Sequence, residues 1–191
     1  MNNKTPRIAC LGWGSLIWKP GELPIFDGWK TDGPMLPVEF ARESGGQRIT
    51  LVICDNVDPV RTCWTLLEAK DIGTAMSTLA SREGISSKRV AMDIGYCDLS
   101  TGMHHGLRAN DIAAWAAGHE LDGVVWTNLP CGFKNSRHIL PTGDQVVSYL
   151  QGLTGQAMDD AREYIERAPL QISTAYRSQI SKELGWVALA I

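Results

Sequence analysis

The chain has 191 residues, which is enough for one domain with a sizeable core and short for two. Hydrophobic residues make up 44% and charged residues 20%, a composition that excludes disorder and low-complexity repeats. With a net charge of -3 and no basic stripe, we expect neither nucleic acid nor an anionic membrane as a partner. No apolar run is long enough for a membrane span, and the first residues lack the apolar stretch of a secretory signal. The sequence therefore predicts a soluble, cytoplasmic protein.

The positions of the cysteines indicate whether they form disulfides or bind a metal. The five cysteines are scattered along the chain and form no C-x-x-C pair; they are Cys10, Cys54, Cys63, Cys97 and Cys131. Their odd number and wide spacing argue against a disulfide framework and against a cysteine-rich zinc site. Most lie in apolar stretches, where a free thiol packs as a small hydrophobic group. We therefore expect free, buried thiols in a reducing compartment.

Most of the chain before residue 130 reads as short strands separated by turns. Runs of apolar and β-branched residues bounded by glycine, proline and aspartate are typical of such strands. The expected strands cover 8–11, 37–40, 49–54, 61–67, 90–96 and 124–126. The prediction for 90–96 rests on alternation, because apolar residues occupy every second position from Val90 to Tyr96.

Two helices are expected among these strands. Apolar residues at helical spacing predict a helix that begins near Ile72 and ends at Glu83. Gly84 follows in the position where glycine commonly ends a helix. Asn110 is expected to cap a short helix over 111–117.

The last third changes to helical patterns. Thr142 and Gln145 form a capping-box signal for a helix through Leu150. A second helix is expected over 156–167 and ends before Pro169. The third carries Ile172, Tyr176, Ile180 and Leu184 and ends at Gly185. Strands first and helices last indicate an α+β domain, a mostly antiparallel sheet or barrel with helices on its outside. Without a linker or a repeat, residues 1–191 are expected to form a single domain.

Standard catalytic and cofactor motifs are absent. The run Gly12–Leu16 lacks the third glycine of a dinucleotide fingerprint and the Gly-Lys-Ser/Thr of a phosphate loop. A nucleophile elbow would need glycine where Ile17 stands. The four histidines do not fall at the spacing of helical metal ligands; they are His104, His105, His119 and His138. We therefore expect neither a metal nor a cofactor.

Two sequence features are candidates for a binding or catalytic role. In Gly12-Trp13-Gly14-Ser15-Leu16 a strand breaks into a glycine-rich turn, whose N–H groups can point into one concavity and hold an anion. Glu83 stands at the end of a well-formed amphipathic helix, where the helix dipole disfavours an acidic residue. On spacing alone, a plain tight turn and a solvated surface glutamate are the commoner explanations.

Together, the order and context of these features resemble a known family. Gly12-Trp-Gly-Ser-Leu-Ile-Trp-Lys-Pro20 resembles the Tyr-Gly-Ser-Leu-Ile-Trp-Lys-Pro segment of ChaC-type γ-glutamylcyclotransferases. Phe40-Ala41-Arg42 and Arg82-Glu83-Gly84 stand where that family carries an arginine and a helix-ending Arg/Gln-Glu pair. The resemblance is good over about 8–99, roughly half of the chain. The three C-terminal helices look like an addition of a subgroup.

The resemblance implies a fold, a reaction and site residues. The fold would be a small, closed or nearly closed barrel over about 8–130, flanked by helices, with an added helical part over about 140–186. The reaction would convert a γ-glutamyl amide or peptide, with glutathione as one candidate, to 5-oxoproline and a free amine, without a cofactor. Glu83 would be the general acid and base. The substrate-binding residues would be Gly12, Trp13, Gly14, Ser15, Leu16 and Arg42.

One departure from the family pattern leaves a second interpretation open. The motif tyrosine of the family is Trp13 here, so a phenol hydroxyl is missing from the turn. The alternative is a non-catalytic module on the same fold that binds a small molecule. Under either interpretation the partner is a small molecule, and the expected state is a monomer or a homodimer.

Overall fold

The computed structural model describes residues 5–190, and these group into two compact units. Unit 1 contains the chain up to Gly12, Lys19–Pro34 and Thr62–Asn128. Unit 2 contains Trp13–Trp18, Met35–Arg61 and the chain from Leu129 onward. Each unit is therefore assembled from separate stretches of the chain. Of the described helices, none has the length and apolar character needed to cross a bilayer.

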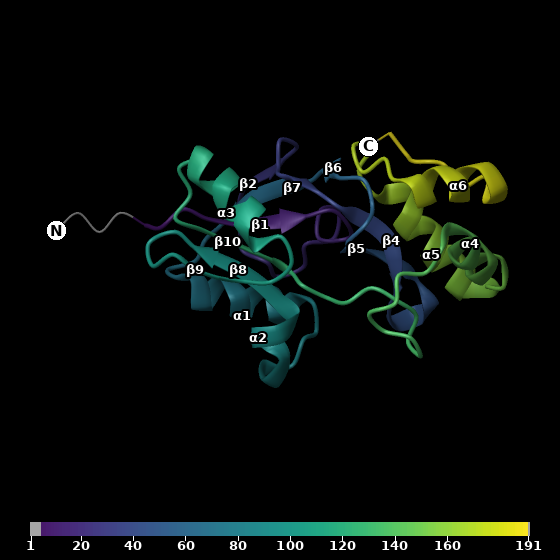
Figure 1. Cartoon of the computed structure of the whole chain (residues 1–191), viewed down its shortest axis with the longest axis horizontal. Helices are drawn as coiled ribbons and strands as arrows, with labels where there is room; N and C mark the ends of the chain where they lie inside the picture. The colour runs from purple at the N-terminus through teal and green to yellow at the C-terminus, as the bar shows by residue number, and fades with distance from the viewer. Residues whose placement is uncertain (1–4, 191) are drawn as a thin grey trace. The chain divides into compact units, whose positions relative to one another are not determined.

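Unit 1 is built on a six-stranded mixed sheet with the order β2-β7-β1-β10-β8-β9 (Figure 1). The strands are β1 (Ile8–Gly12), β2 (Ile25–Lys30), β7 (Cys63–Leu67), β8 (Ile94–Asp98), β9 (Met103–His105) and β10 (Gly123–Thr127). β1 and β10 are parallel, and every other neighbouring pair is antiparallel. The α+β class predicted from the sequence is confirmed.

The closed barrel expected from the family resemblance is not formed by the described strands. The six-stranded sheet is open, with β2 and β9 at its two edges. The remaining strands lie in unit 2 and pair only with each other, as two separate two-stranded sheets. Hydrogen bonding therefore does not run continuously around a ring of strands, as closure of a barrel requires.

Helices α1 (Ile72–Arg82) and α3 (Ala109–Gly118) cover opposite faces of this sheet (Figure 1). Gly123 leaves room for Ile72 at the start of α1, because a Cβ at Gly123 would overlap the Ile72 Cδ1 atom. Asp71 caps α1 by accepting a hydrogen bond from the Thr74 amide at 2.7 Å. Gly84, with a φ of 66°, follows its end as predicted.

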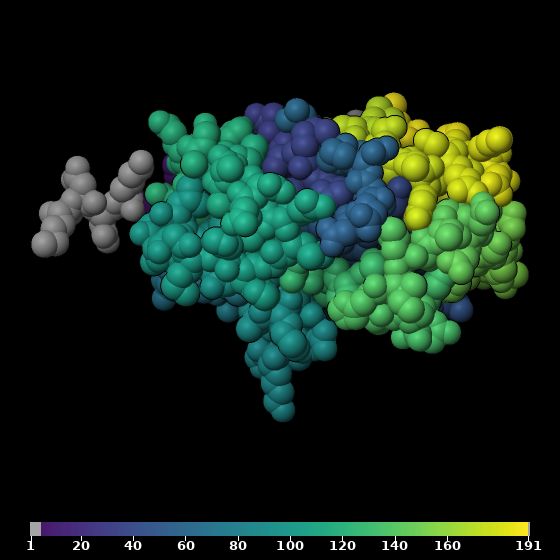
Figure 2. All heavy atoms as spheres, viewed as in Figure 1, coloured from purple at the N-terminus to yellow at the C-terminus, as the bar shows by residue number. Residues whose placement is uncertain are grey.

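Two local predictions in unit 1 are wrong. Residues 87–93 are helical, as η2 (Ser87–Arg89) and α2 (Val90–Asp93), so the strand begins at Ile94 rather than Val90. Arg89 holds both carboxylate oxygens of Asp93, at 2.6 and 2.8 Å, and this i,i+4 ion pair favours a helical turn over the strand that alternation suggested. The segment 87–93 lies in the teal part of the surface in Figure 2.

The second error concerns α3, which begins one residue before the expected cap. Ala109 and Asn110 are both inside the helix, and Arg108 is the residue that precedes it. Arg108 has a φ of 60° and provides no side-chain cap. The backbone turn through Gly106 therefore starts the helix, and the asparagine signal does not locate its first residue.

Unit 2 combines two small sheets with three helices. Its strands are β3 (Met35–Leu36), β4 (Val38–Glu43), β5 (Ile49–Ile53) and β6 (Val60–Arg61), with η1 (Gly45–Gln47) between β4 and β5. β3 pairs with β6 and β4 pairs with β5, both antiparallel. The helices are α4 (Gly143–Gln151), α5 (Gly155–Arg167) and α6 (Ala175–Leu184). The capping box of Thr142 and Gln145 is confirmed.

Two buried charged residues attach α6 to the rest of unit 2. Glu39 on β4 is 1% exposed and accepts hydrogen bonds from the Thr174 hydroxyl and the Tyr176 amide at the start of α6. Arg177 donates to five backbone carbonyls at and beyond the end of α5, including those of Ile165 and Ala168. Because Thr174 caps the helix, Ile172 lies before α6 rather than within it.

All five thiols are free, as predicted. Four are buried, and only Cys131 is partly exposed. Burial raises the pKa of each buried thiol, to about 11 for Cys63 and Cys97. The thiols are therefore neutral core groups at physiological pH.

Candidate active site

Glu83 stands at the C-terminal end of α1 and forms an ion pair with its neighbour in the sequence. Its backbone N–H donates to the Leu79 carbonyl and closes the last turn of the helix. Its carboxylate Oε1 lies 2.8 Å from Nη1 of Arg82. The two side chains are only 19% and 14% exposed, so the interpretation of a solvated surface glutamate does not fit. The positive guanidinium beside the carboxylate offsets the unfavourable helix dipole at this position.

This ion pair lies near Cys10 in the middle of β1. Cys10 on β1 is close enough to Glu83 and Arg82 for both charges to act on its thiol: burial raises the pKa of Cys10 most, Glu83 raises it further and Arg82 lowers it. Cys10 and Gly12 share one face of the strand, because residues two apart point to the same side. Glu83 therefore lies on the sheet face that Cys10 and Gly12 share.

Arg82 also holds the point where the glycine-rich segment returns to unit 1. Its Nη2 donates to the Lys19 carbonyl, and its Cγ lies beside Gly21. The segment Gly12–Pro20 leaves unit 1 after Gly12 and re-enters it at Lys19. In unit 1, the returning end of the segment that resembles the family motif is therefore bound by Arg82, which also pairs with Glu83.

The middle of that segment, Trp13–Trp18, is a turn within unit 2. The Ile17 amide donates to the Gly14 carbonyl at 3.0 Å. Trp13 is 4% exposed, and its indole N–H donates to the Leu51 carbonyl at 3.1 Å, so this side chain anchors the turn to β5. Within residues 5–190, the amides of Gly14 and Leu16 donate to no other protein group. Two backbone donors of the turn are thus left for another acceptor.

Arg42, the remaining predicted substrate-binding residue, contacts the chain after residue 129. Its Nη1 donates to the Pro130 carbonyl at 2.7 Å, and its backbone forms an isolated parallel bridge with Gly132. Arg42 therefore attaches the segment 130–132 to β4. This contact gives Arg42 a structural role in unit 2.

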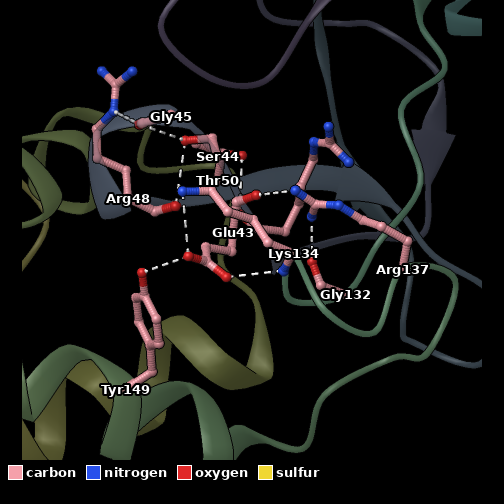
Figure 3. A network of polar contacts seen from close by, with 10 residues as sticks. Glu43, Ser44, Gly45, Arg48, Thr50, Gly132, Lys134, Arg137 and Tyr149 are labelled. Atoms are coloured by element: carbon pink, nitrogen blue, oxygen red, sulfur yellow. Dashed lines mark hydrogen bonds and ion pairs between the residues drawn. The ribbon is translucent and has the colours of Figure 1, made fainter.

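A second polar cluster surrounds Glu43 on the same strand (Figure 3). The Glu43 carboxylate accepts hydrogen bonds from the Tyr149 hydroxyl at 3.1 Å and from the Lys134 amide at 2.9 Å. Partial burial opposes ionisation, but these hydrogen bonds and the Lys134 charge lower the pKa of Glu43 overall. Arg137 binds the carbonyls of Glu43 and Gly132. The cluster connects β4, the segment 130–137 and α4.

The structure also places a tyrosine at the turn that the sequence did not single out for this role. Tyr164 on α5 is 7% exposed, and its hydroxyl lies directly against Gly14. The only signal in the sequence was its residue type in the C-terminal third. About 150 positions separate the two residues, so no local pattern could have paired them.

The histidines are not gathered into a site. His104 and His105 lie exposed on the edge strand β9. Among the residues that the structure describes, no group of three or more His, Cys, Asp or Glu side chains could hold a metal ion.

Comparisons with known proteins identify no relative of this chain. No family model, no curated protein and no solved structure matches this chain. A functional proposal for this chain therefore rests on the sequence resemblance and on the contacts of Arg82 and Glu83.

Proposed function

We propose that this protein is a γ-glutamylcyclotransferase-like enzyme, which converts a γ-glutamyl amide or peptide to 5-oxoproline and a free amine. One observation supports the proposal most. In unit 1, Arg82 binds the Lys19 carbonyl at the returning end of the Gly12–Pro20 segment and also forms the half-buried ion pair with Glu83. These are the two segments on which the sequence resemblance rests. The proposal assigns this activity to a protein whose described strands form an open mixed sheet with helices on both faces.

The proposed reaction is an internal aminolysis. The α-amine nitrogen of the γ-glutamyl group attacks its own γ-carbonyl carbon and forms the lactam C–N bond. The amide bond to the leaving amine then breaks, and its electron pair remains on the departing nitrogen. Because nucleophile and electrophile belong to one molecule, the protein contributes mainly by holding the substrate in its cyclising conformation. No electrons are exchanged, so the step needs no redox partner.

Glu83 would carry the protons in this reaction. The substrate ammonium must lose a proton before it attacks, and the leaving amine must gain one. An ionised carboxylate can accept the first proton and then donate it to the leaving nitrogen. The Arg82 guanidinium at 2.8 Å would orient this carboxylate. General acid–base catalysis of this kind contributes on the order of 10²–10⁴-fold.

The turn Trp13–Leu16 would bind the negative charge of the substrate. The amides of Gly14 and Leu16 are backbone donors of the kind that hold a carboxylate or a developing oxyanion. Ser15 would position the substrate through its hydroxyl rather than act as a nucleophile. Trp13 would take no direct part, since its indole N–H is bound to Leu51.

The test is 5-oxoproline release, followed by mass spectrometry, from glutathione and a panel of γ-glutamyl dipeptides and amines. We expect product from at least one substrate, and a loss of about 10²-fold or more in the Glu83→Gln variant. Glu68→Gln is the matched control, because it removes an exposed carboxylate from the same unit. No product from the whole panel, or an undiminished rate in Glu83→Gln, would refute the proposal.

A further inference from the structure

The backbone of the turn Trp13–Leu16 is in contact with the hydroxyl of Tyr164, a residue of α5. An ideal Cβ at Gly14 would overlap the Tyr164 Oη atom and lie 3.0 Å from Cζ. Only glycine at position 14 allows this approach. The ring of Tyr164 is buried and packs edge-on against Phe40 at 6.4 Å and Trp18 at 5.5 Å between ring centroids. The hydroxyl is therefore held at Gly14 by a ring with little freedom to move.

Leu51 links Tyr164 to the turn a second time. The Leu51 amide donates to Tyr164 Oη at 3.3 Å, and the Leu51 carbonyl accepts from the Trp13 indole N–H at 3.1 Å. β5 pairs only with β4, so its other edge has no neighbouring strand. A buried edge must satisfy its N–H and C=O groups by other means. At Leu51, one side chain of the turn and one side chain of α5 do so together.

We propose that Tyr164 is a positioning residue that fixes the backbone of the Trp13–Leu16 turn for ligand binding. This inference rests on the proposed function for the nature of the ligand, a γ-glutamyl substrate with its α-carboxylate on the turn. The claim that Tyr164 fixes the backbone of the turn rests only on contacts within unit 2. The Tyr164 hydroxyl restricts movement of the turn backbone at Gly14. The contacts of Tyr164 and Trp13 with Leu51 fix the distance between the turn and β5. The turn thus has a phenol hydroxyl against its backbone although its own sequence carries tryptophan at position 13.

The experiment compares Tyr164→Phe with Tyr176→Phe. Both variants keep an aromatic ring and lose a phenol hydroxyl within unit 2. The Tyr176 hydroxyl, however, donates to the Pro141 carbonyl just before α4 and not to the turn. Hydrogen exchange is measured at the Ile17 and Leu51 amides, whose bonds to the Gly14 carbonyl and the Tyr164 hydroxyl report the turn directly. We expect exchange about fivefold faster in Tyr164→Phe only, the size of effect that loss of one buried hydrogen bond produces. Exchange at the wild-type rate would overturn the proposal.

Kinetics with an active substrate then tests the link to binding. We expect Tyr164→Phe to raise KM about fivefold while kcat stays within about twofold, since a loosened turn weakens substrate binding rather than proton transfer. Tyr176→Phe should leave both constants unchanged. An unchanged KM in Tyr164→Phe would overturn the role in binding. If the wild-type protein releases no 5-oxoproline, the proposed function fails, and hydrogen exchange still decides whether Tyr164 positions the turn.

Discussion

The phenol oxygen of Tyr164 occupies the space that a Cβ on Gly14 would need. The glycine that follows Trp13 is therefore required by a contact with a helix far along the chain, and not only by the local bend of the turn. This contact allows the role of that glycine to be measured as a pairwise interaction between positions 14 and 164.

Substitution of Gly14 by alanine should destabilise the fold. We expect Gly14→Ala to lower the free energy of unfolding by about 2 kcal/mol, the usual cost of inserting a methyl group into a filled space. In the Tyr164→Phe background the cost should fall by about 1 kcal/mol, because the overlapping oxygen is gone. Urea denaturation of the four proteins in this double-mutant cycle measures the coupling. Strictly additive effects would contradict the contact.

Arg82 should not be replaceable by lysine. Its guanidinium reaches Glu83 through one nitrogen and the Lys19 carbonyl through another. A lysine ammonium is a point charge on a flexible stem and cannot reproduce this forked geometry. We expect Arg82→Lys to reduce kcat/KM for 5-oxoproline formation about tenfold, while circular dichroism remains that of the wild type. Wild-type kcat/KM in this variant would show that the pair does not orient Glu83.

Two glutamates on β4 should affect the pH dependence of stability in opposite directions. Burial raises the pKa of Glu39 above its ordinary value of 4.5, with its hydrogen bonds to Thr174 and backbone amides opposing the change. Above pH 4.5 the unfolded chain ionises at Glu39 before the folded protein does, so its contribution to stability falls as the pH rises through the raised pKa. We expect Glu39→Gln to gain stability relative to the wild type as the pH rises above 4.5.

Glu43 behaves in the reverse sense because its pKa in the folded protein is lowered. Its stabilising contribution is complete above pH 4.5 and is lost as the pH falls through the lowered pKa. The difference in unfolding free energy between the wild type and Glu43→Gln should therefore shrink on acidification below pH 4.5. Urea titrations of both variants between pH 3 and pH 8 check the two signs. Parallel pH profiles would contradict the assigned environments.

Arg177 should be among the most sensitive positions for stability. The residue is 6% exposed, and its guanidinium donates to five carbonyls around the end of α5. Arg177→Met removes these donors and leaves buried carbonyls unpaired, so we expect a loss of about 3 kcal/mol in unfolding free energy. Arg177→Lys should recover only part of it, because one ammonium cannot reach all five groups. Chemical denaturation measures both, and a loss below about 1 kcal/mol for Arg177→Met would be inconsistent with this network.

Sequence patterns located the elements whose signals are local. The helix from Ile72 to Glu83 and the capping box at Thr142 were predictable because spacing and cap lie within a few neighbouring residues. The helical turn over 90–93 could not be predicted in this way. Its alternating apolar residues favour a strand, whereas the i,i+4 ion pair between Arg89 and Asp93 favours a helix, and both signals are local. The strand pairing was also out of reach, since β1 bonds to strands more than 50 positions away.

The residues of the candidate site and its surroundings also differ in whether a local sequence pattern identifies them. Glu83 and the Gly12–Leu16 run carry recognisable local sequence. Tyr164 and Glu39 owe their surroundings to tertiary packing, and neither stands in a motif. The family resemblance implied that Arg42 binds substrate. Its contact with Pro130 could not be predicted, because it forms only when the distant segment is in position.

The dependence of Gly14 on Tyr164 also has a consequence during synthesis. The turn emerges among the first residues of the chain, whereas the ring that confines it appears only after most of the chain has been translated. Partial products that stop before α5 would carry the whole Gly12–Pro20 segment and Glu83 and still lack the confined turn. In this arrangement ligand-binding competence would arise late, at the stage when α5 docks. Under the proposed function, a nascent chain would therefore lack a confined substrate-binding turn until α5 has been made.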